Sequence, residues 1–224
     1  MPCRNGGDLD VSWRIGLRVI APVVTLCFRL RVVGIERVPV GAAVLAGNHV
    51  SSLDGVLLAV ATGRRAHRMT RFLVAAEFFA KRRTGWALRL YRQIPLRRGA
   101  RDDAALDEAV STVAAGALAG IFPEGRVNPE PAAGLQRGHS GVARIALAAG
   151  APVVPVGLWG TQDRWPLSGL RLGRPLRSSV AIVYGEAIQP RGLANLEDDV
   201  QAFRDVVMRS IDTQVVLARE MTRD

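Results

Sequence analysis

The chain has 224 residues, 49% hydrophobic and 22% charged, a composition that fits one globular domain with a full core and excludes an intrinsically disordered chain. Its net charge of +10 is concentrated in residues 1–101, which hold 18 basic and 5 acidic residues, whereas residues 102–224 carry a net charge of −3. We therefore expect an anionic partner for the N-terminal half, and nucleic acid, an anionic membrane surface and a phosphorylated substrate all fit.

Residues 11–33 form the first predicted element, an apolar segment interrupted by arginines. The uncharged run between Arg18 and Arg29 is 10 residues long, which is well short of the roughly 20 that a helix needs to span a bilayer. Arginines at both ends, together with Trp13 and Pro22, favour a helix that lies in the membrane interface. The alternative is an amphipathic helix that packs on the core.

A buried strand followed by a helix is predicted next. Residues 42–46 are a compact apolar run bounded by two glycines, and residues 51–60 start with serines and continue with an apolar segment. His49 would then lie in a strand-to-helix turn, with Asp54 in the first helical turn. Reactive groups gather at such strand ends in α/β sheets.

The histidine and the carboxylate of this turn suggest acid–base chemistry. A neutral histidine can take a proton from an alcohol near pH 7, and a carboxylate beside it can fix its tautomer and stabilise the imidazolium. In the alternative interpretation Ser51 and Asp54 form a capping box, and His49 is an ordinary turn residue. These seven residues alone leave both interpretations open.

Further strands and helices alternate along the rest of the chain. Strands are predicted at residues 71–76, 93–98, 117–122, 152–157 and 179–184, and helices at 84–91, 102–115, 138–149 and from 196 onward. We expect Trp86 and Tyr91 to lie in the core. In the last helix apolar residues recur at steps of three and four and should close the core: Val200, Phe203, Val207, Ile211 and Val215.

This alternation predicts a single-domain α/β fold, a mixed sheet flanked by helices, preceded by an N-terminal amphipathic helix at the membrane interface. We place the membrane-associating segment at residues 1–33 and the α/β domain at residues 34–224. The sequence contains no Walker loop, dinucleotide fingerprint or zinc spacing. Cys3 and Cys27 provide no disulfide framework, which favours a reducing, cytosol-facing environment.

Four segments, taken together and in order, resemble the signatures of the glycerolipid acyltransferases, the family of the 1-acylglycerol-3-phosphate acyltransferases. Asn48-His49-Val50-Ser51-Ser52-Leu53-Asp54 resembles the first signature, in which four residues separate the histidine from the aspartate. The other three are similar to residues 94–98, 122–126 and 153–157. Any one of them alone is weak, but four in this order and spacing favour the acid–base interpretation of His49.

The resemblance implies an O-acyltransferase that moves an acyl chain from an acyl-thioester to the free hydroxyl of a lysophosphatidate and so forms phosphatidate. It implies His49 as the general base and Asp54 as its orienting partner. It also implies a phosphate- and glycerol-binding site made of Arg98, Phe122, Pro123, Glu124, Gly125 and Arg126. A thioester is already activated, so we expect neither a metal, a cofactor nor a covalent enzyme intermediate. The N-terminal amides of the helix that begins near Ser51 are candidates for stabilising the oxyanion.

The expected partners follow from this chemistry. They are a lysophospholipid, an acyl-thioester on coenzyme A or acyl carrier protein, and an anionic membrane surface at the cytoplasmic face of the cell membrane, with peripheral or monotopic attachment. Nucleic acid is not expected, because the cationic segment at 11–33 is apolar between its arginines and no aromatic RNA-binding signature is visible.

The third signature departs from the family's pattern. Arg126 follows Gly125 directly, and Asn128 occupies the later polar position where the family usually has serine. The family's lysine before the second-signature glutamate is replaced by Ala75. Glycerol 3-phosphate, another lysophospholipid or a glycolipid therefore remain alternative acceptors, and a non-catalytic basic protein that binds membrane or RNA is the alternative from a different class.

Overall fold

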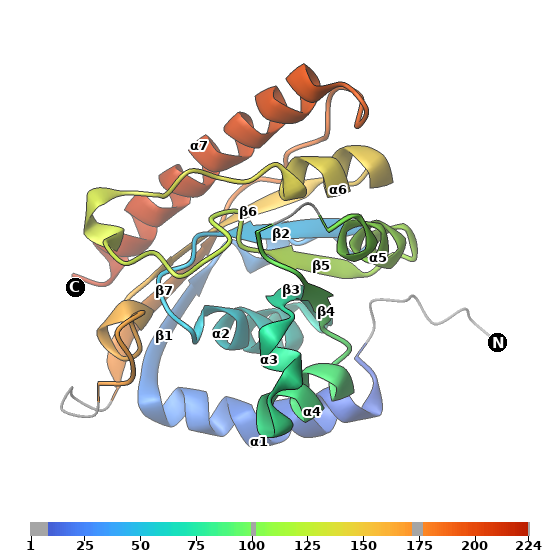
Figure 1. The fold of residues 1–224 in the computed structure, drawn as a ribbon. Helices are drawn as coiled ribbons and strands as arrows, with labels where there is room; N and C mark the ends of the chain where they lie inside the picture. The colour runs from blue at the N-terminus through green and yellow to red at the C-terminus, as the bar shows by residue number, and fades with distance from the viewer. Residues whose placement is uncertain (1–8, 100–101, 172–176, 224) are drawn as a thin grey trace.

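The computed structural model describes residues 9–99, 102–171 and 177–223. In these ranges seven strands form one sheet in the order β1-β7-β6-β2-β5-β3-β4 (Figure 1). The strands are β1 (Phe28–Val33), β2 (Ala43–Gly47), β3 (Thr70–Ala75), β4 (Ile94–Leu96), β5 (Leu118–Ile121), β6 (Val153–Trp159) and β7 (Ser178–Tyr184). Paired neighbours are parallel except β6 and β7, which are antiparallel. The predicted α/β fold with a mixed sheet is confirmed.

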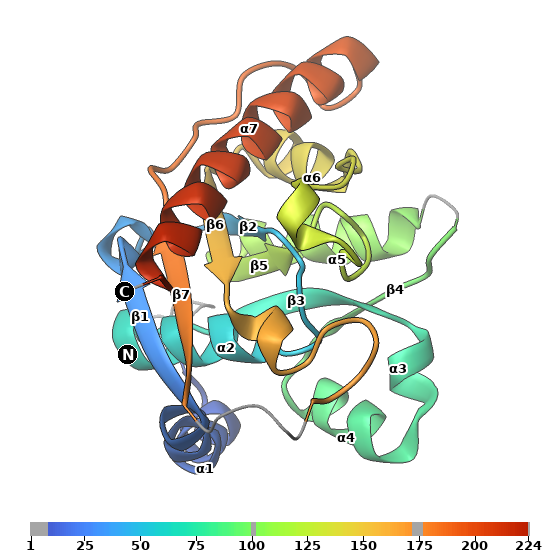
Figure 2. The ribbon, with the colours of Figure 1, turned by 90° about the vertical axis from the view of Figure 1, so that its left-hand side faces the viewer.

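Helices cover both faces of the sheet, so the fold has three layers (Figures 1 and 2). One face carries α5 (Asp103–Ala114), α6 (Gly141–Ala149) and α7 (Glu197–Met221), and the other carries α1 (Val11–Cys27) and α2 (Asp54–Ala61). Two short helices, α3 (Glu77–Ala80) and α4 (Arg82–Leu90), lie at the same end of the molecule as α1.

The period of two along β2 divides the core into two clusters. Val44 and Ala46 pack under α5, α6 and α7, whereas Ala43 and Leu45 point to the opposite face and pack with α1 and α2. Because both faces are covered, the whole of β2 is buried. The apolar residues predicted to form the core face of the last helix, at positions 200, 203, 207, 211 and 215, are all buried.

The N-terminal helix is confirmed but is shorter than the predicted span of 11–33. It begins after Asp10, whose carboxylate accepts a hydrogen bond of 3.0 Å from the amide of Trp13, and ends at Cys27. Residues 28–33 instead form β1, which pairs with β7 along its whole length. The alternation of arginines and apolar residues in Phe28–Val33 suits an edge strand better than a helix. Among the described residues, no helix combines the length and apolar character needed to cross a bilayer.

Candidate active site

The carboxyl ends of three adjacent parallel strands bring the central residues of the site together. His49 follows β2, Glu124 follows β5 and Thr161 follows β6, and β2 pairs with both β5 and β6. The carboxyl ends of parallel strands meet at one edge of a sheet, where ligands of open α/β folds bind. Segments far apart in the sequence therefore meet at the His49 turn.

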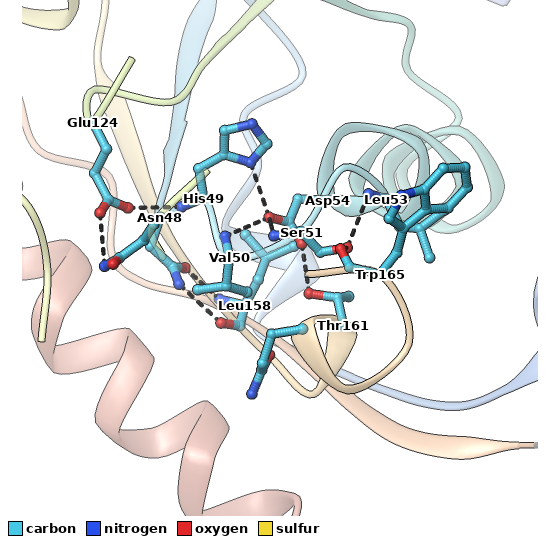
Figure 3. A network of polar contacts seen from close by, with 12 residues as sticks. Asn48, His49, Val50, Ser51, Leu53, Asp54, Glu124, Leu158, Thr161 and Trp165 are labelled. Atoms are coloured by element: carbon cyan, nitrogen blue, oxygen red, sulfur yellow. Dashed lines mark hydrogen bonds and ion pairs between the residues drawn. The ribbon is translucent and has the colours of Figure 1, made fainter. Parts of the chain in front are cut away.

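His49 and Asp54 form the hydrogen-bonded pair that the sequence predicts. Nδ1 of His49 lies 3.0 Å from Oδ2 of Asp54 (Figure 3). With Asp54 ionised, Nδ1 carries the hydrogen of this bond, so Nε2 is left as the basic nitrogen. Figure 3 shows that the second ring nitrogen points away from the carboxylate. The His49 side chain is 17% exposed, whereas Asp54 is fully buried.

Four donors fix the Asp54 carboxylate. Oδ2 also accepts the backbone amides of Val50 at 2.7 Å and Ser51 at 2.8 Å, and Oδ1 accepts the hydroxyl of Thr161 at 2.6 Å. Only one of the two bonds of a capping box is present, because Asp54 accepts the Ser51 amide whereas the Ser51 hydroxyl accepts the Leu53 amide instead of the Asp54 amide. Thr161 was missed by sequence reasoning. It lies 107 positions away in the chain, and no local pattern connects it with Asp54.

The sheet itself anchors the turn that precedes His49. The side-chain amide of Asn48 donates to the carbonyl of Leu158 at 2.9 Å and accepts the Leu158 amide at 2.7 Å, so it extends the pairing of β2 with β6. The Ser51 hydroxyl donates to the carbonyl of Trp165 at 2.7 Å and accepts the Leu53 amide at 3.1 Å. The loop after β6 is thus attached to the turn that precedes α2.

Glu124 contacts the backbone of His49. Its Oε1 accepts the His49 amide at 2.8 Å, and its Oε2 accepts the Gln136 amide at 2.9 Å and the side chain of Asn128 at 3.1 Å. The backbone amide of Asn128 in turn donates to the His49 carbonyl at 2.6 Å. Burial raises the pKa of the Glu124 carboxyl, and the hydrogen bonds from Gln136 and His49 oppose that rise. Glu124 is 3% exposed, and both of its oxygens bind protein donors.

Phe122 forms one wall of the histidine site. Its ring stacks on the imidazole of His49, with centroids 4.3 Å apart, and on the ring of Phe72 at 5.7 Å. Pro123 is buried and its carbonyl accepts the His139 amide at 2.8 Å. Gly125 closes the turn with a φ of 70°, a conformation that disfavours residues with a Cβ.

A comparison with known protein families covers the segment that holds these residues. Residues 29–159, more than half of the chain, match the sequence profile of the Acyltransferase family. The chain belongs to the Acyltransferase family. The matched segment holds the His49 turn, the segment after β5 and both strands that flank β2.

This acyltransferase is also similar to individual proteins in sequence and to one solved structure in fold. Uncharacterized proteins from Mycobacterium bovis and Mycobacterium tuberculosis are 33% identical over 150 residues, which cover 62% of the chain and 40% of theirs. The chain thus spans about 40% of the length of these curated relatives. The crystal structure of the 1-acyl-sn-glycerophosphate acyltransferase PlsC from Thermotoga maritima aligns with a TM-score of 0.65 and 24% identity, over 90% of this chain and 78% of that one. At this identity the match shows a shared fold.

The two predicted phosphate-binding arginines of the acyltransferase form hydrogen bonds with other residues than His49 and Asp54. Arg98 follows β4 and its Nη1 lies 3.1 Å from Oε1 of Glu77, which follows β3. Arg126 is exposed, and its Nε donates to the side chain of Gln136 at 3.0 Å. Both residues lie on the same edge of the sheet as His49, but the structure gives neither a direct contact with it. Across the described part of the chain, no three His, Cys, Asp or Glu side chains form a set that could hold a metal ion.

Several amides expected to bind the oxyanion have other partners. Those of Val50 and Ser51 donate to Asp54, and that of Leu53 donates to the Ser51 hydroxyl. These three positions precede α2, and the expectation that the amides near Ser51 bind the oxyanion is not supported there.

Proposed function

We propose that this acyltransferase transfers an acyl chain from an acyl-thioester, carried on coenzyme A or acyl carrier protein, to the free hydroxyl of 1-acylglycerol 3-phosphate. The observation that carries this proposal is the His49–Asp54 hydrogen bond of 3.0 Å at the carboxyl edge of the sheet. An imidazole held by a buried carboxylate, with its other nitrogen accessible, is suited to remove a proton from an alcohol.

The reaction then needs one base and no covalent intermediate. As the hydroxyl oxygen attacks the thioester carbon, its proton moves to Nε2 of His49 and the carbonyl electrons move onto the carbonyl oxygen. When the tetrahedral intermediate collapses, the carbon–sulfur bond breaks and the proton on Nε2 passes to the thiolate. Asp54 stabilises the imidazolium between the two transfers.

Arg98 and Arg126 are proposed to bind the acceptor's phosphate, together with the segment from Phe122 to Gly125. A phosphomonoester requires cationic donors, and arginine provides paired N–H groups for its oxygens. The partners of Glu124 favour a role in holding the His49 turn.

Another acceptor remains the second candidate, and one observation favours it. The polar side chain that the family's pattern would place near the phosphate is Asn128 here, which is buried and bonded to Glu124. A panel of acceptors with one thioester donor distinguishes the candidates. Equal rates on acceptors with and without a phosphate would contradict the roles given to Arg98 and Arg126.

We further propose peripheral attachment to an anionic membrane, at its cytoplasmic face, through α1. One side of this helix packs on the core through Trp13, Ala21 and Val24. An exposed apolar stripe follows another side at steps of three or four: Val11, Ile15, Val19, Val23 and Leu26. Arg14 and Arg18 lie exposed within the same helix, as in helices that lie in a lipid interface.

Replacing His49 with alanine tests the chemical step. Release of free thiol from an acyl-thioester in the presence of lysophosphatidate should fall by about 10²–10⁴-fold, the usual contribution of a general base. The circular dichroism spectrum should be unchanged, since His49 is not part of the core. Undiminished thiol release would remove His49 from the mechanism.

A further inference from the structure

The hairpin made by α3 and α4 exposes large apolar side chains. Trp86, predicted from the sequence to lie in the core, is 66% exposed, so that prediction is wrong. Leu90 and Phe78 are also exposed, at 37% and 36%. An open cavity of about 550 Å³ lies on this hairpin, lined by Phe79, Trp86 and Leu90 and by three cations, Lys81, Arg82 and Arg89. A single exposed tryptophan is ordinary, but an apolar cavity bordered by cations indicates a ligand or a surface.

Charge identifies the chemistry of that surface. Residues 77–92 hold five basic residues and one acidic residue, a net charge of +4. The ammonium group of Lys81 lies 4.9 Å from the centroid of the Phe78 ring, and Arg89 donates to the carbonyl of Phe79 at 2.9 Å. One cation thus lies beside an aromatic ring, and a second is held against the backbone of α3. This combination suits an anionic lipid surface, where rings enter the interface and cations reach the phosphates.

The hairpin is also continuous with α1. Trp13 of α1 and Tyr91, the residue after α4, pack edge to face with centroids 5.5 Å apart. Gly16 leaves room for this contact, since a Cβ there would lie 2.1 Å from the Tyr91 hydroxyl. Figures 1 and 2 show α1 and α4 at the same end of the molecule. A bilayer that contacts α1 therefore lies close to α4, whereas a small acidic protein would need only one of them.

We propose that the α3–α4 hairpin is a second docking surface for an anionic phospholipid bilayer, with Trp86 and Leu90 in the interface and Lys81, Arg82 and Arg89 on lipid phosphates. This inference rests on the proposed function only for the membrane location. Glu77 is the first residue of α3 and pairs with Arg98. Docking through this hairpin therefore brings the proposed phosphate-binding edge next to the bilayer that supplies the acceptor.

Sedimentation of the full chain with vesicles tests the proposal without any chemistry. Vesicles of phosphatidylcholine with phosphatidylglycerol are compared with phosphatidylcholine alone, using Trp86→Ala and Leu90→Glu. Each variant should lower partitioning onto the anionic vesicles by about tenfold, as expected for the loss of one buried apolar side chain. The matched control is Leu193→Glu, an exposed leucine (58%) in the loop before α7 at the opposite end of the molecule, which should bind like the wild type.

The other outcomes are also informative. If both variants partition like the wild type and Val19→Glu in α1 loses binding, the proposal of a second docking surface is refuted, whereas the proposed membrane attachment through α1 is supported. Binding of acyl carrier protein that depends on Trp86, with unchanged vesicle binding, would assign the hairpin to that protein instead. Activity separates the proposals further: Trp86→Ala should keep its turnover on a short-chain, water-soluble lysophosphatidate and lose it on acceptor embedded in vesicles.

Discussion

Replacing Asp54 with asparagine separates the charge of this residue from its hydrogen bonds. The asparagine oxygen can take the place of Oδ2, which accepts His49 Nδ1 and the amides of Val50 and Ser51. The amide nitrogen then faces the Thr161 hydroxyl, which can rotate to accept from it. All four hydrogen bonds are kept, but they are no longer made to a charged acceptor. We therefore expect the free energy of unfolding to decrease by about 1–2 kcal/mol. Turnover should fall by about 10²–10⁴-fold, because the imidazolium loses its counter-charge.

Asp54→Ala should behave differently. It leaves two buried amides without an acceptor, at about 1–3 kcal/mol each, and should destabilise the fold by about 2–6 kcal/mol in denaturant unfolding. The matched control is Asp102→Asn, another buried aspartate that accepts amides, those of Arg97 and Ala105, but does not contact His49. We expect this control to lower stability and to keep thiol release. Near wild-type turnover by Asp54→Asn, with the fold intact, would refute the role of the carboxylate.

Three further predictions concern the surroundings of the pair. Thr161→Val removes one donor to Asp54 and should lower turnover by about fivefold with little change in KM, because one hydrogen bond contributes about 1 kcal/mol; an unchanged turnover would mean that Asp54 is held by its other partners. Arg98→Ala should raise the KM for lysophosphatidate by about 10–100-fold and leave the KM of a phosphate-free acceptor unchanged, and an equal change for both acceptors would argue against a phosphate contact. Because burial raises the pKa of Glu124 in the folded state, the wild type should lose stability as pH rises through the interval between the unfolded and the folded pKa. Glu124→Gln does not titrate and should remove that part of the pH dependence in thermal melts; identical profiles would contradict the raised pKa.

Local patterns identified most of the elements. The apolar run at 42–46 and the repeat from Val200 to Val215 correctly predicted a strand and a helix. A strand that is buried on both faces is a continuous apolar run, whereas a helix that is buried on one face has apolar residues at steps of three and four. The spacing of His49 and Asp54 predicted their contact because both lie within a single turn. Short-range geometry of this kind is encoded locally.

Features that depend on tertiary pairing were missed or misplaced. The segment 28–33 pairs with a strand some 150 positions later, so its apolar character was taken for the continuation of a helix. Thr161 reaches Asp54 only because β2 and β6 are neighbours in the sheet. Trp86 was expected in the core on hydrophobicity alone, which cannot distinguish a buried aromatic side chain from an exposed one.

The pairing of β1 with β7 makes the segment that carries α1 part of the sheet and not a removable appendage. A shortened protein that starts at residue 34 would expose the backbone of β7 along a new open edge, a template for strand pairing between copies. A truncation intended to reduce aggregation should therefore remove only residues before Asp10. A deeper truncation removes the exposed apolar side chains of α1 but leaves β7 as an unpaired edge strand.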